Sequence, residues 1–219
     1  MQNIPRIFLN QDLNIGKIFP VGRDIVHYLR HVMRRGDCLV FNNGYEYHAV
    51  LSDDDKNIIV QEKTDHDDVS NYIVLCFAPI KKTDELLNMA TQMGVCAFQP
   101  VITDRTVAHH INWQRMEKIL IEASEQSNRN SVPKLLPPVK FEDFDLSGVV
   151  VADERAAHGK SIVNDKKFGN KILIGPEGGF SESEFEKMDA FGVCGVSLGK
   201  TILRAEVATV VAITKVLNQ

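Results

Sequence analysis

Residues Lys171–Leu217 read KILIGPEGGFSESEFEKMDAFGVCGVSLGKTILRAEVATVVAITKVL and contain two short apolar runs, each ending in a glycine-bearing loop. The run 172–174 is followed by Gly-Pro-Glu-Gly-Gly at 175–179, and the run 193–198 by Gly-Lys-Thr at 199–201. In open α/β sheets, a buried strand that ends abruptly at glycine presents backbone groups to a ligand at the carboxyl edge. The pattern therefore predicts two loops that meet around one small molecule.

The segments that precede and follow these loops are typical of a parallel α/β sheet. Residues 72–78 form a nearly unbroken apolar run, as expected of a strand that is buried on both faces. Thr83 begins a helix with acidic residues in its first turn, Gly94 ends it, and residues 95–99 form the next strand. A strand–helix–strand unit of this length predicts a right-handed parallel crossover. The remaining expected elements are a helix at 112–127, a strand at 149–152, a helix that begins at the Ser181/Glu184 capping box, and a last helix at 203–217.

The first part of the chain predicts a small β-barrel. Short strands are expected at 7–9 and 58–60, with a hairpin at 37–51 between them that turns at Asn43-Gly44. An acidic and polar segment is expected to link this barrel to the rest of the chain. The predicted domains are residues 1–68 and residues 72–219, joined by a linker within 64–71.

A helix with one basic face is expected between residues 23 and 33. Its buried stripe would consist of Ile25, Leu29, Val32 and Met33, which recur at helical spacing. The opposite side would gather basic residues, namely Arg23, His27, Arg30 and Arg34, with His31 beside them and Arg35 just beyond. A solvated helix face would also explain such a cluster. Because the planar guanidinium of arginine suits phosphate, we favour contact with RNA.

Composition places the chain among ordinary soluble proteins. It has 219 residues, a net charge of −4, 44% hydrophobic residues and 25% charged residues. The four cysteines are scattered without paired spacing, which favours free thiols in a reducing compartment over disulfides or a metal site. The N-terminal residues lack the order of a signal peptide, and no apolar run has membrane-spanning length. We therefore expect a cytoplasmic protein with no membrane partner.

Several common chemistries lack their motifs in this sequence. Neither glycine loop matches the GxGxxG or GxxxxGK[ST] pattern of nucleotide binding, and no HExxH or GxSxG motif is present. What remains is two backbone-rich loops, apolar walls and the polar residues Glu177, Arg204 and Glu206. This combination suits a ligand held mainly by backbone hydrogen bonds and apolar contact.

The two loops resemble those of the ribosomal RNA small-subunit methyltransferase E family of the SPOUT (α/β-knot) superfamily. The resemblance rests on IGPEGGF at 174–180 and on Leu198-Gly199 followed by ILRxE at 202–206. It extends over most of the chain, through HxLR at 27–30, the Lys81-Lys82 pair and EQSxR at 125–129. It implies an α/β fold with a deep trefoil knot in a parallel sheet, joined to an N-terminal PUA-like barrel, in a homodimer. It also implies S-adenosylmethionine-dependent methylation of N3 of one uridine in small-subunit ribosomal RNA.

The resemblance also implies roles for particular residues. S-adenosylmethionine would contact Ile174, Gly175, Pro176, Glu177, Gly178, Gly179, Leu198, Gly199, Ile202 and Leu203. The catalytic residues would be Arg204 and Glu206, and no metal is expected. RNA would contact Arg6, Arg23, His27, Arg30, Arg34, Arg35, Lys81, Lys82 and Arg129. We hypothesise that Arg204 stabilises the developing uracil anion or grips a phosphate; the alternative is an ion pair with Glu206 or Glu177.

The chain departs from the family pattern at four residues in three places. Gln92 stands where the family commonly has Glu, and Thr201 where it commonly has Arg. Ala205 and Val207 replace two threonines, which removes two hydroxyl groups near the expected site. Two other interpretations remain open: a SPOUT enzyme that acts on transfer RNA or a ribose hydroxyl, and a non-catalytic RNA-binding module.

Overall fold

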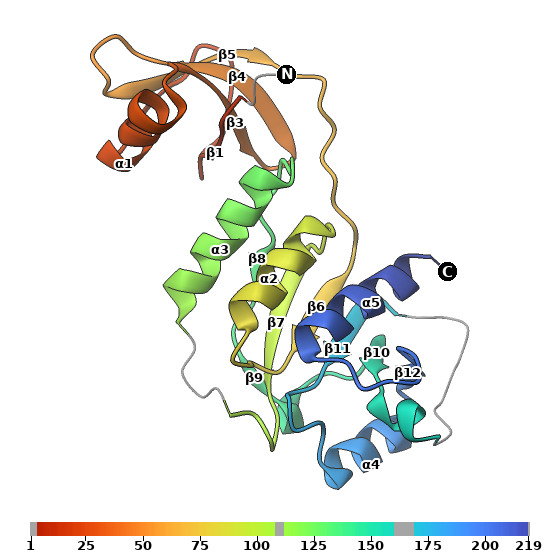
Figure 1. Ribbon diagram of the computed structural model, residues 1–219. Helices are drawn as coiled ribbons and strands as arrows, with labels where there is room; N and C mark the ends of the chain where they lie inside the picture. The colour runs from red at the N-terminus through yellow and green to blue at the C-terminus, as the bar shows by residue number, and fades with distance from the viewer. Residues whose placement is uncertain (1–3, 108–111, 160–168, 219) are drawn as a thin grey trace. The chain divides into compact units, whose positions relative to one another are not determined.

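The computed structural model describes residues 4–107, 112–159 and 169–218, and its contacts divide the chain into two units (Figure 1). The first unit comprises Met1–Ser70 and Ser124–Val132, and the second comprises Asn71–Ala123 and Pro133–Gln219. The helix expected at 112–127 is present as α3 (Trp113–Gln126). Its last turn and the loop that follows it belong to the first unit, which sequence patterning alone did not suggest.

The first unit is built on a curled five-stranded sheet (Figure 1). The predicted hairpin is confirmed: Asn43 and Gly44 both have positive φ, 51° and 83°, as a tight hairpin turn requires. A register shift between His48 and Ala49 adds to the curl of the sheet. The strands are β1 (Arg6–Phe8), β2 (Ile18–Pro20), β3 (Asp37–Asn42), β4 (Tyr45–Leu51) and β5 (Asn57–Lys63), in the order β1-β3-β4-β5-β2.

The helix expected at 23–33 winds differently from the prediction. It begins as α1 (Arg23–His27) and continues as a π-helix, η1 (Tyr28–Met33). Leu29 is fully buried as expected, but Val32 is 58% exposed, so its place in the buried stripe was wrong. The wider i→i+5 winding of a π-helix changes the angle between successive side chains and turns Val32 out of the stripe.

The second unit contains the predicted parallel sheet, which has seven strands. Six strands follow the order β12-β10-β11-β6-β7-β8, and β9 pairs with β7. The strands are β6 (Val74–Phe77), β7 (Ala97–Ile102), β8 (Lys134–Leu135), β9 (Val139–Lys140), β10 (Val149–Ala152), β11 (Lys171–Ile174) and β12 (Cys194–Val196). The short strands β8 and β9 and the 3₁₀ turn η2 (Phe141–Asp143) lie in a segment for which the sequence predicted no helix or strand.

Helices cover the strands of this sheet, as their apolar sequences require. On α4 (Glu182–Phe191), Met188 packs in one buried cluster with Val151 and Leu173. Ile172 and Ile174 alternate with Leu173 and therefore point to the opposite face. Contacts link α2 (Thr83–Gln92) with α5 (Ala205–Leu217), and α5 with β10 and β11.

The beginnings of α4 and α5 set the two loops in place. The predicted capping box is confirmed, because Glu184 N donates to Ser181 Oγ at 3.3 Å and Ser181 N donates to Glu184 Oε2 at 2.8 Å. α5 begins at Ala205, two residues later than expected, since Arg204 is extended with ψ 151°. Arg204 is thus the N-cap residue of α5 and belongs to the loop.

Candidate functional site

Four neighbouring strands end at one edge of the parallel sheet. β12, β10, β11 and β6 are adjacent and parallel, so their carboxyl ends lie together. A cavity of about 650 Å³ opens at this edge and is lined by the segments that follow all four strands. Ligands of open α/β sheets bind at such carboxyl edges, so this cavity is the candidate site.

The two glycine-bearing loops meet here, as predicted. All ten residues expected to hold a small molecule, from Ile174 to Gly179 and from Leu198 to Leu203, line this one cavity. Arg204 and Glu206, the expected catalytic residues, line it as well, and so do Lys81 and Lys82. The prediction that the two glycine-bearing loops come together is therefore confirmed.

Contacts from outside the loop hold the first glycine loop in shape. The backbone N–H of Lys81 donates to Glu177 Oε1 at 3.0 Å, and Arg105 Nη1 donates to the carbonyl of Gly178 at 2.9 Å. A side chain at Gly175 would place its Cβ 2.8 Å from the ring of Phe180, which is buried. Glycine at this position therefore lets the loop close over the ring.

The segment after β10 forms a third wall that sequence analysis missed. Glu154 lies in η3 (Glu154–His158) and lines the cavity, with its carboxylate beside the glycine loop. Gly179 has φ +68°, and a Cβ there would lie 2.5 Å from Glu154 Oε1. Burial raises the pKa of Glu154, and a hydrogen bond from the Phe180 backbone opposes that rise. The available signal was the charged triplet directly after the predicted strand 149–152.

Asp153, the neighbour of Glu154, is held by an arginine bridge. Its side chain is buried, and Arg155 donates to it at 3.0 and 2.7 Å. Arg155 also pairs with Asp189 on α4 at 2.7 Å and lies 4.0 Å from the ring centre of Phe185. Hydrogen bonds from Arg155 lower the pKa of Asp189. This network joins the end of β10 to α4.

The second loop is held to the last helix of the sheet domain. Lys215 Nζ on α5 donates to the carbonyl of Ser197 at 2.7 Å, at the point where the chain leaves β12. Gly199 has φ +126°, a conformation that side-chain-bearing residues rarely adopt. Ile202 is 68% exposed, so this loop offers the cavity an apolar surface.

The charged residues of the cavity fall into paired and unpaired groups. Lys82 Nζ lies 2.8 Å from Glu85 Oε2 and 3.5 Å from Oε1 of the buried Glu206. The hydrogen bond to Glu85 is the main cause of the raised pKa of Lys82. Arg204 is exposed, and its guanidinium forms no ion pair within the described part of the chain. The predicted alternative, an ion pair of Arg204 with Glu206 or Glu177, is therefore wrong.

The residues expected to contact RNA fall into four groups. Arg23, His27 and Arg34 are exposed in the first unit, while Lys81 and Lys82 line the cavity of the second. Two further arginines are exposed in part but form ion pairs, Arg30 with Asp55 at 2.7 Å and Arg35 with Asp37. Arg6 and Arg129 form the fourth group, and both are buried.

Arg6 and Arg129 are buried, and their predicted contact with RNA is corrected. Arg6 is 8% exposed and pairs with Glu46 at 2.8 Å. It also donates to Asn130 Oδ1 at 2.6 Å and to the Arg129 carbonyl at 3.0 Å. With these buried partners, the Arg6 guanidinium holds the segment 124–132 against β1 and cannot reach a phosphate.

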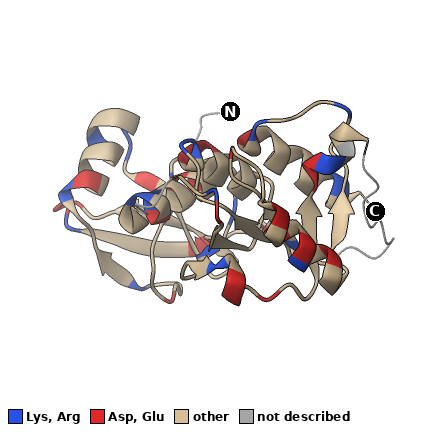
Figure 2. Ribbon diagram, turned by 90° about the horizontal axis from the view of Figure 1, so that it is seen from below, with Lys and Arg blue, Asp and Glu red and all other residues tan. Residues whose placement is uncertain are grey.

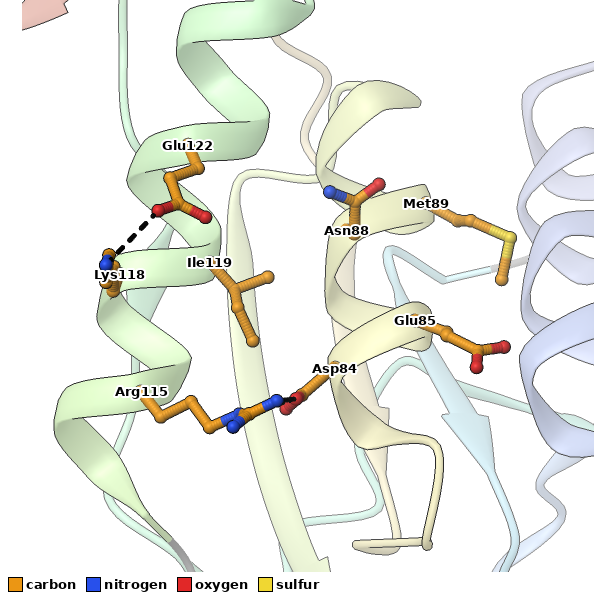
Figure 3. Close-up of a pocket in the computed structure, with 8 residues that line it drawn as sticks. All are labelled: Asp84, Glu85, Asn88, Met89, Arg115, Lys118, Ile119 and Glu122. Carbon is orange, nitrogen blue, oxygen red and sulfur yellow. Dashed lines mark hydrogen bonds and ion pairs between the residues drawn. The ribbon is translucent and has the colours of Figure 1, made fainter. Parts of the chain in front are cut away.

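A second hollow, between α2 and α3, has a different character (Figure 3). It measures about 540 Å³ and is lined by helix side chains alone, without any of the four strand ends. Its charges are largely paired with each other, as Arg115 with Asp84 and Lys118 with Glu122. Basic and acidic residues also lie close together along other elements (Figure 2). We therefore retain the cavity at the sheet edge as the candidate site.

Metal-ligand clusters and membrane-spanning helices are both absent from the described residues. Among them, no three His, Cys, Asp or Glu side chains come together as metal ligands would. No helix in the ranges that the structure covers is long and apolar enough to span a bilayer.

Comparison with known proteins yields consistent matches. Residues 68–217 match the family model described as RNA methyltransferase domain. The ribosomal RNA small subunit methyltransferase E of Rickettsia conorii is 31% identical over 229 residues, covering 96% of this chain and 94% of that protein. The enzyme of the same name from Buchnera aphidicola subsp. Acyrthosiphon pisum is 30% identical, covering 97% and 92%.

A solved structure is similar over nearly the whole chain. It is the crystal structure of a ribosomal RNA small subunit methyltransferase E from Neisseria gonorrhoeae bound to S-adenosyl methionine. The two chains share 26% identity with a TM-score of 0.84, over 99% of this chain and 98% of the other.

Proposed function

The chain belongs to the ribosomal RNA small subunit methyltransferase E family, and we propose that it methylates N3 of one uridine in small-subunit ribosomal RNA with S-adenosylmethionine. The observation that carries this proposal is the single cavity at the sheet edge, where both glycine loops and Arg204 come together. Its volume of about 650 Å³ falls within the range of small-molecule sites.

The residues present fit such a methyl donor. Backbone groups of 175–179 and 198–203 would bind its polar atoms, while Ile174, Ile202 and Leu203 supply apolar contact. The close contact between Gly179 and Glu154 leaves no room for a side chain, so the backbone itself forms the wall. When bound, S-adenosylmethionine supplies a methyl group activated by its sulfonium. The protein's task is then to orient the RNA base and to stabilise the charge that develops on it.

Uridine N3 carries a proton and becomes nucleophilic only as that proton leaves. In the transfer, the N3–C bond forms, the C–S bond breaks and the N3 proton passes to a base. Negative charge develops on the uracil oxygens as the proton leaves, before the transfer is complete, and Arg204 at the cavity would stabilise it. Glu206 is the second proposed catalytic residue, and it holds the ammonium group of Lys82 at the cavity.

RNA would be held by basic residues of both units. In the first unit these are the exposed Arg23, His27 and Arg34, together with Arg30 and Arg35, whose guanidinium groups are partly exposed while they pair with their carboxylates. In the second unit, Lys81 and Lys82 line the cavity and would contact the RNA beside the target base. On this proposal, residues 1–68 form a PUA-like RNA-binding barrel.

The second unit would carry the remaining family properties. We propose that residues 72–219 form a knotted SPOUT domain that catalyses the transfer and forms a homodimer in the cytoplasm. Val207 and Leu217 on α5 are 44% and 49% exposed, which is consistent with a partner surface on this helix. Sedimentation velocity at several protein concentrations would detect the dimer.

The test of catalysis is Arg204→Ala. We expect methylation to fall about 100- to 1000-fold because one stabilising donor is lost, while the affinity for S-adenosylmethionine stays unchanged in calorimetry. Lys200→Ala is the control, since it removes an equal charge from the same loop at a residue that does not line the cavity. Normal turnover of Arg204→Ala would dispose of its proposed role.

Mapping the modified nucleotide tests the substrate. Ribosomal RNA from a deletion strain should lack one N3-methyluridine, and the purified protein with S-adenosylmethionine should restore it. Loss of a transfer RNA or ribose methyl group instead would contradict the proposed substrate but retain the donor. Failure to bind S-adenosylmethionine would favour a non-catalytic RNA-binding module.

A further inference from the structure

The first unit contains a hollow of about 330 Å³, here called the histidine hollow. It lies between the helical segment α1–η1 and the turn that leads into β5. Its volume is at the lower end of the range for small-ligand pockets. It is lined by Arg23, His27, His31, Asp55 and Lys56, over a floor of Val21 and Val26.

Two aromatic rings stand together in this hollow. The ring centres of His27 and His31 are 5.1 Å apart, with 38° between the ring planes, and both residues are exposed. In an α-helix, residues four apart are offset by about 40° around the axis. The π-helical winding from Tyr28 to Met33 changes that offset, and π-turns of this kind recur at functional sites.

The charge of the hollow is positive. Arg23 and Lys56 contribute cationic side chains, and Lys56 is only loosely paired with Asp54, at 3.8 Å. Asp55 is the acid that lines the hollow, and Arg30 neutralises it at 2.7 Å. The described residues offer no third metal ligand beside the histidines. Aromatic rings between cationic side chains are the combination with which proteins bind unpaired nucleotides.

We propose that the histidine hollow binds one unpaired nucleotide of the RNA substrate. The base stacks on the rings of His27 and His31, and the adjoining phosphate lies between Arg23 and Lys56. This inference rests on the proposed function and adds to it a defined subsite, with Lys56 as a contact outside the basic face of the helix.

Binding of fluorescent decauridine to the full-length protein, measured by anisotropy over a range of salt, tests the subsite. We expect His27→Ala/His31→Ala to weaken binding about tenfold without changing the salt slope, because stacking releases no counterions. Arg23→Ala/Lys56→Ala should weaken binding and reduce the slope of log K against log salt by about 0.7, because the contact with one phosphate is lost. Lys17→Ala is the control, an exposed lysine of the same unit outside the hollow.

An aromatic replacement separates stacking from general damage. His27→Tyr/His31→Tyr keeps two ring faces and should retain the wild-type affinity, and far-UV circular dichroism and melting should be unchanged in every variant. In methylation assays, the alanine pair should raise KM for ribosomal RNA while kcat and the affinity for S-adenosylmethionine stay constant. If the alanine pair binds decauridine as tightly as wild type does, the subsite is overturned.

The outcomes distinguish this proposal from the proposed function. Wild-type methylation with no effect of the histidine variants on binding or KM would remove the subsite and leave the function intact. Histidine-dependent decauridine binding by a protein that methylates no RNA would remove the function and leave the subsite. Loss of affinity in the arginine–lysine variant alone would show a phosphate site without stacking and would also overturn the proposal.

Discussion

Replacing Gly179 by alanine adds only a methyl group, but it should destabilise the fold and weaken the binding of S-adenosylmethionine. Two costs add at this position. The backbone has φ +68°, where a side-chain-bearing residue is disfavoured by about 1–2 kcal/mol. The new Cβ would also lie 2.5 Å from Glu154 Oε1, so the carboxylate must move and weaken its hydrogen bond from the Phe180 backbone. A hydrogen bond to a charged group contributes about 1.5–3 kcal/mol.

Gly192→Ala provides the matched control. Gly192 has φ +78°, and a Cβ there meets no atom within 4 Å, so only the backbone cost applies. We expect urea denaturation to show a loss of about 1–2 kcal/mol for Gly192→Ala and about 3–5 kcal/mol for Gly179→Ala. Calorimetry should show at least a tenfold loss of affinity for S-adenosylmethionine in Gly179→Ala alone, since a shift of the loop moves its backbone groups.

Two results would refute this reasoning. Equal stability of the two variants would mean that the Glu154 carboxylate moves away from the new Cβ without loss of folding stability. Unchanged affinity for S-adenosylmethionine in Gly179→Ala would mean that the donor does not contact this loop. Glu154→Ala in the Gly179→Ala background should remove the clash, so the excess loss of stability over Gly192→Ala should shrink.

Two further predictions concern charged groups. Burial raises the pKa of Glu154, so its neutral form stabilises the fold below about pH 4 and that stability is lost as pH rises through the raised pKa. Glu154→Gln should therefore be more stable than wild type at pH 7 and equal to it near pH 4 in urea denaturation; equal stability at pH 7 would contradict the assignment. Glu46→Leu should cost about 3–5 kcal/mol because it leaves the buried Arg6 without its carboxylate, whereas Arg6→Met/Glu46→Leu should cost much less. A loss below about 1 kcal/mol in the single variant would show that Arg6 is not held as described.

Much of the second unit could be predicted from local patterns. Continuous apolar runs marked the strands because a parallel sheet is buried on both faces, and the Ser181/Glu184 pair marked the beginning of α4. The ends of these elements shifted by up to three residues, and Arg204 caps α5 instead of lying in its first turn. Helix boundaries depend on backbone angles that residue identity only biases.

The contacts between distant residues could not be read from such patterns. Arg6 and Arg34 are the same residue type, yet Arg34 is exposed and Arg6 is buried. Arg6 is buried because its guanidinium pairs with Glu46 and Asn130, which are distant in sequence. Val32 fits an α-helical stripe and still faces solvent, because the helix widens to π winding before it. Which side chains form ion pairs depends on neighbours that are far away in sequence. Whether a helix winds as α or π depends on small differences in backbone energy.

By itself, the sequence determined the parallel sheet, the two glycine loops and the chemistry of the residues that they carry. Those properties follow from local periodicity and from the glycines that only certain backbone conformations require. Tertiary structure alone decided that Glu154 forms the third wall of the cavity, and that His27 and His31 stand beside Lys56. The physical reason is that strand order and helix winding, which no local pattern contains, set which side chains become neighbours in space.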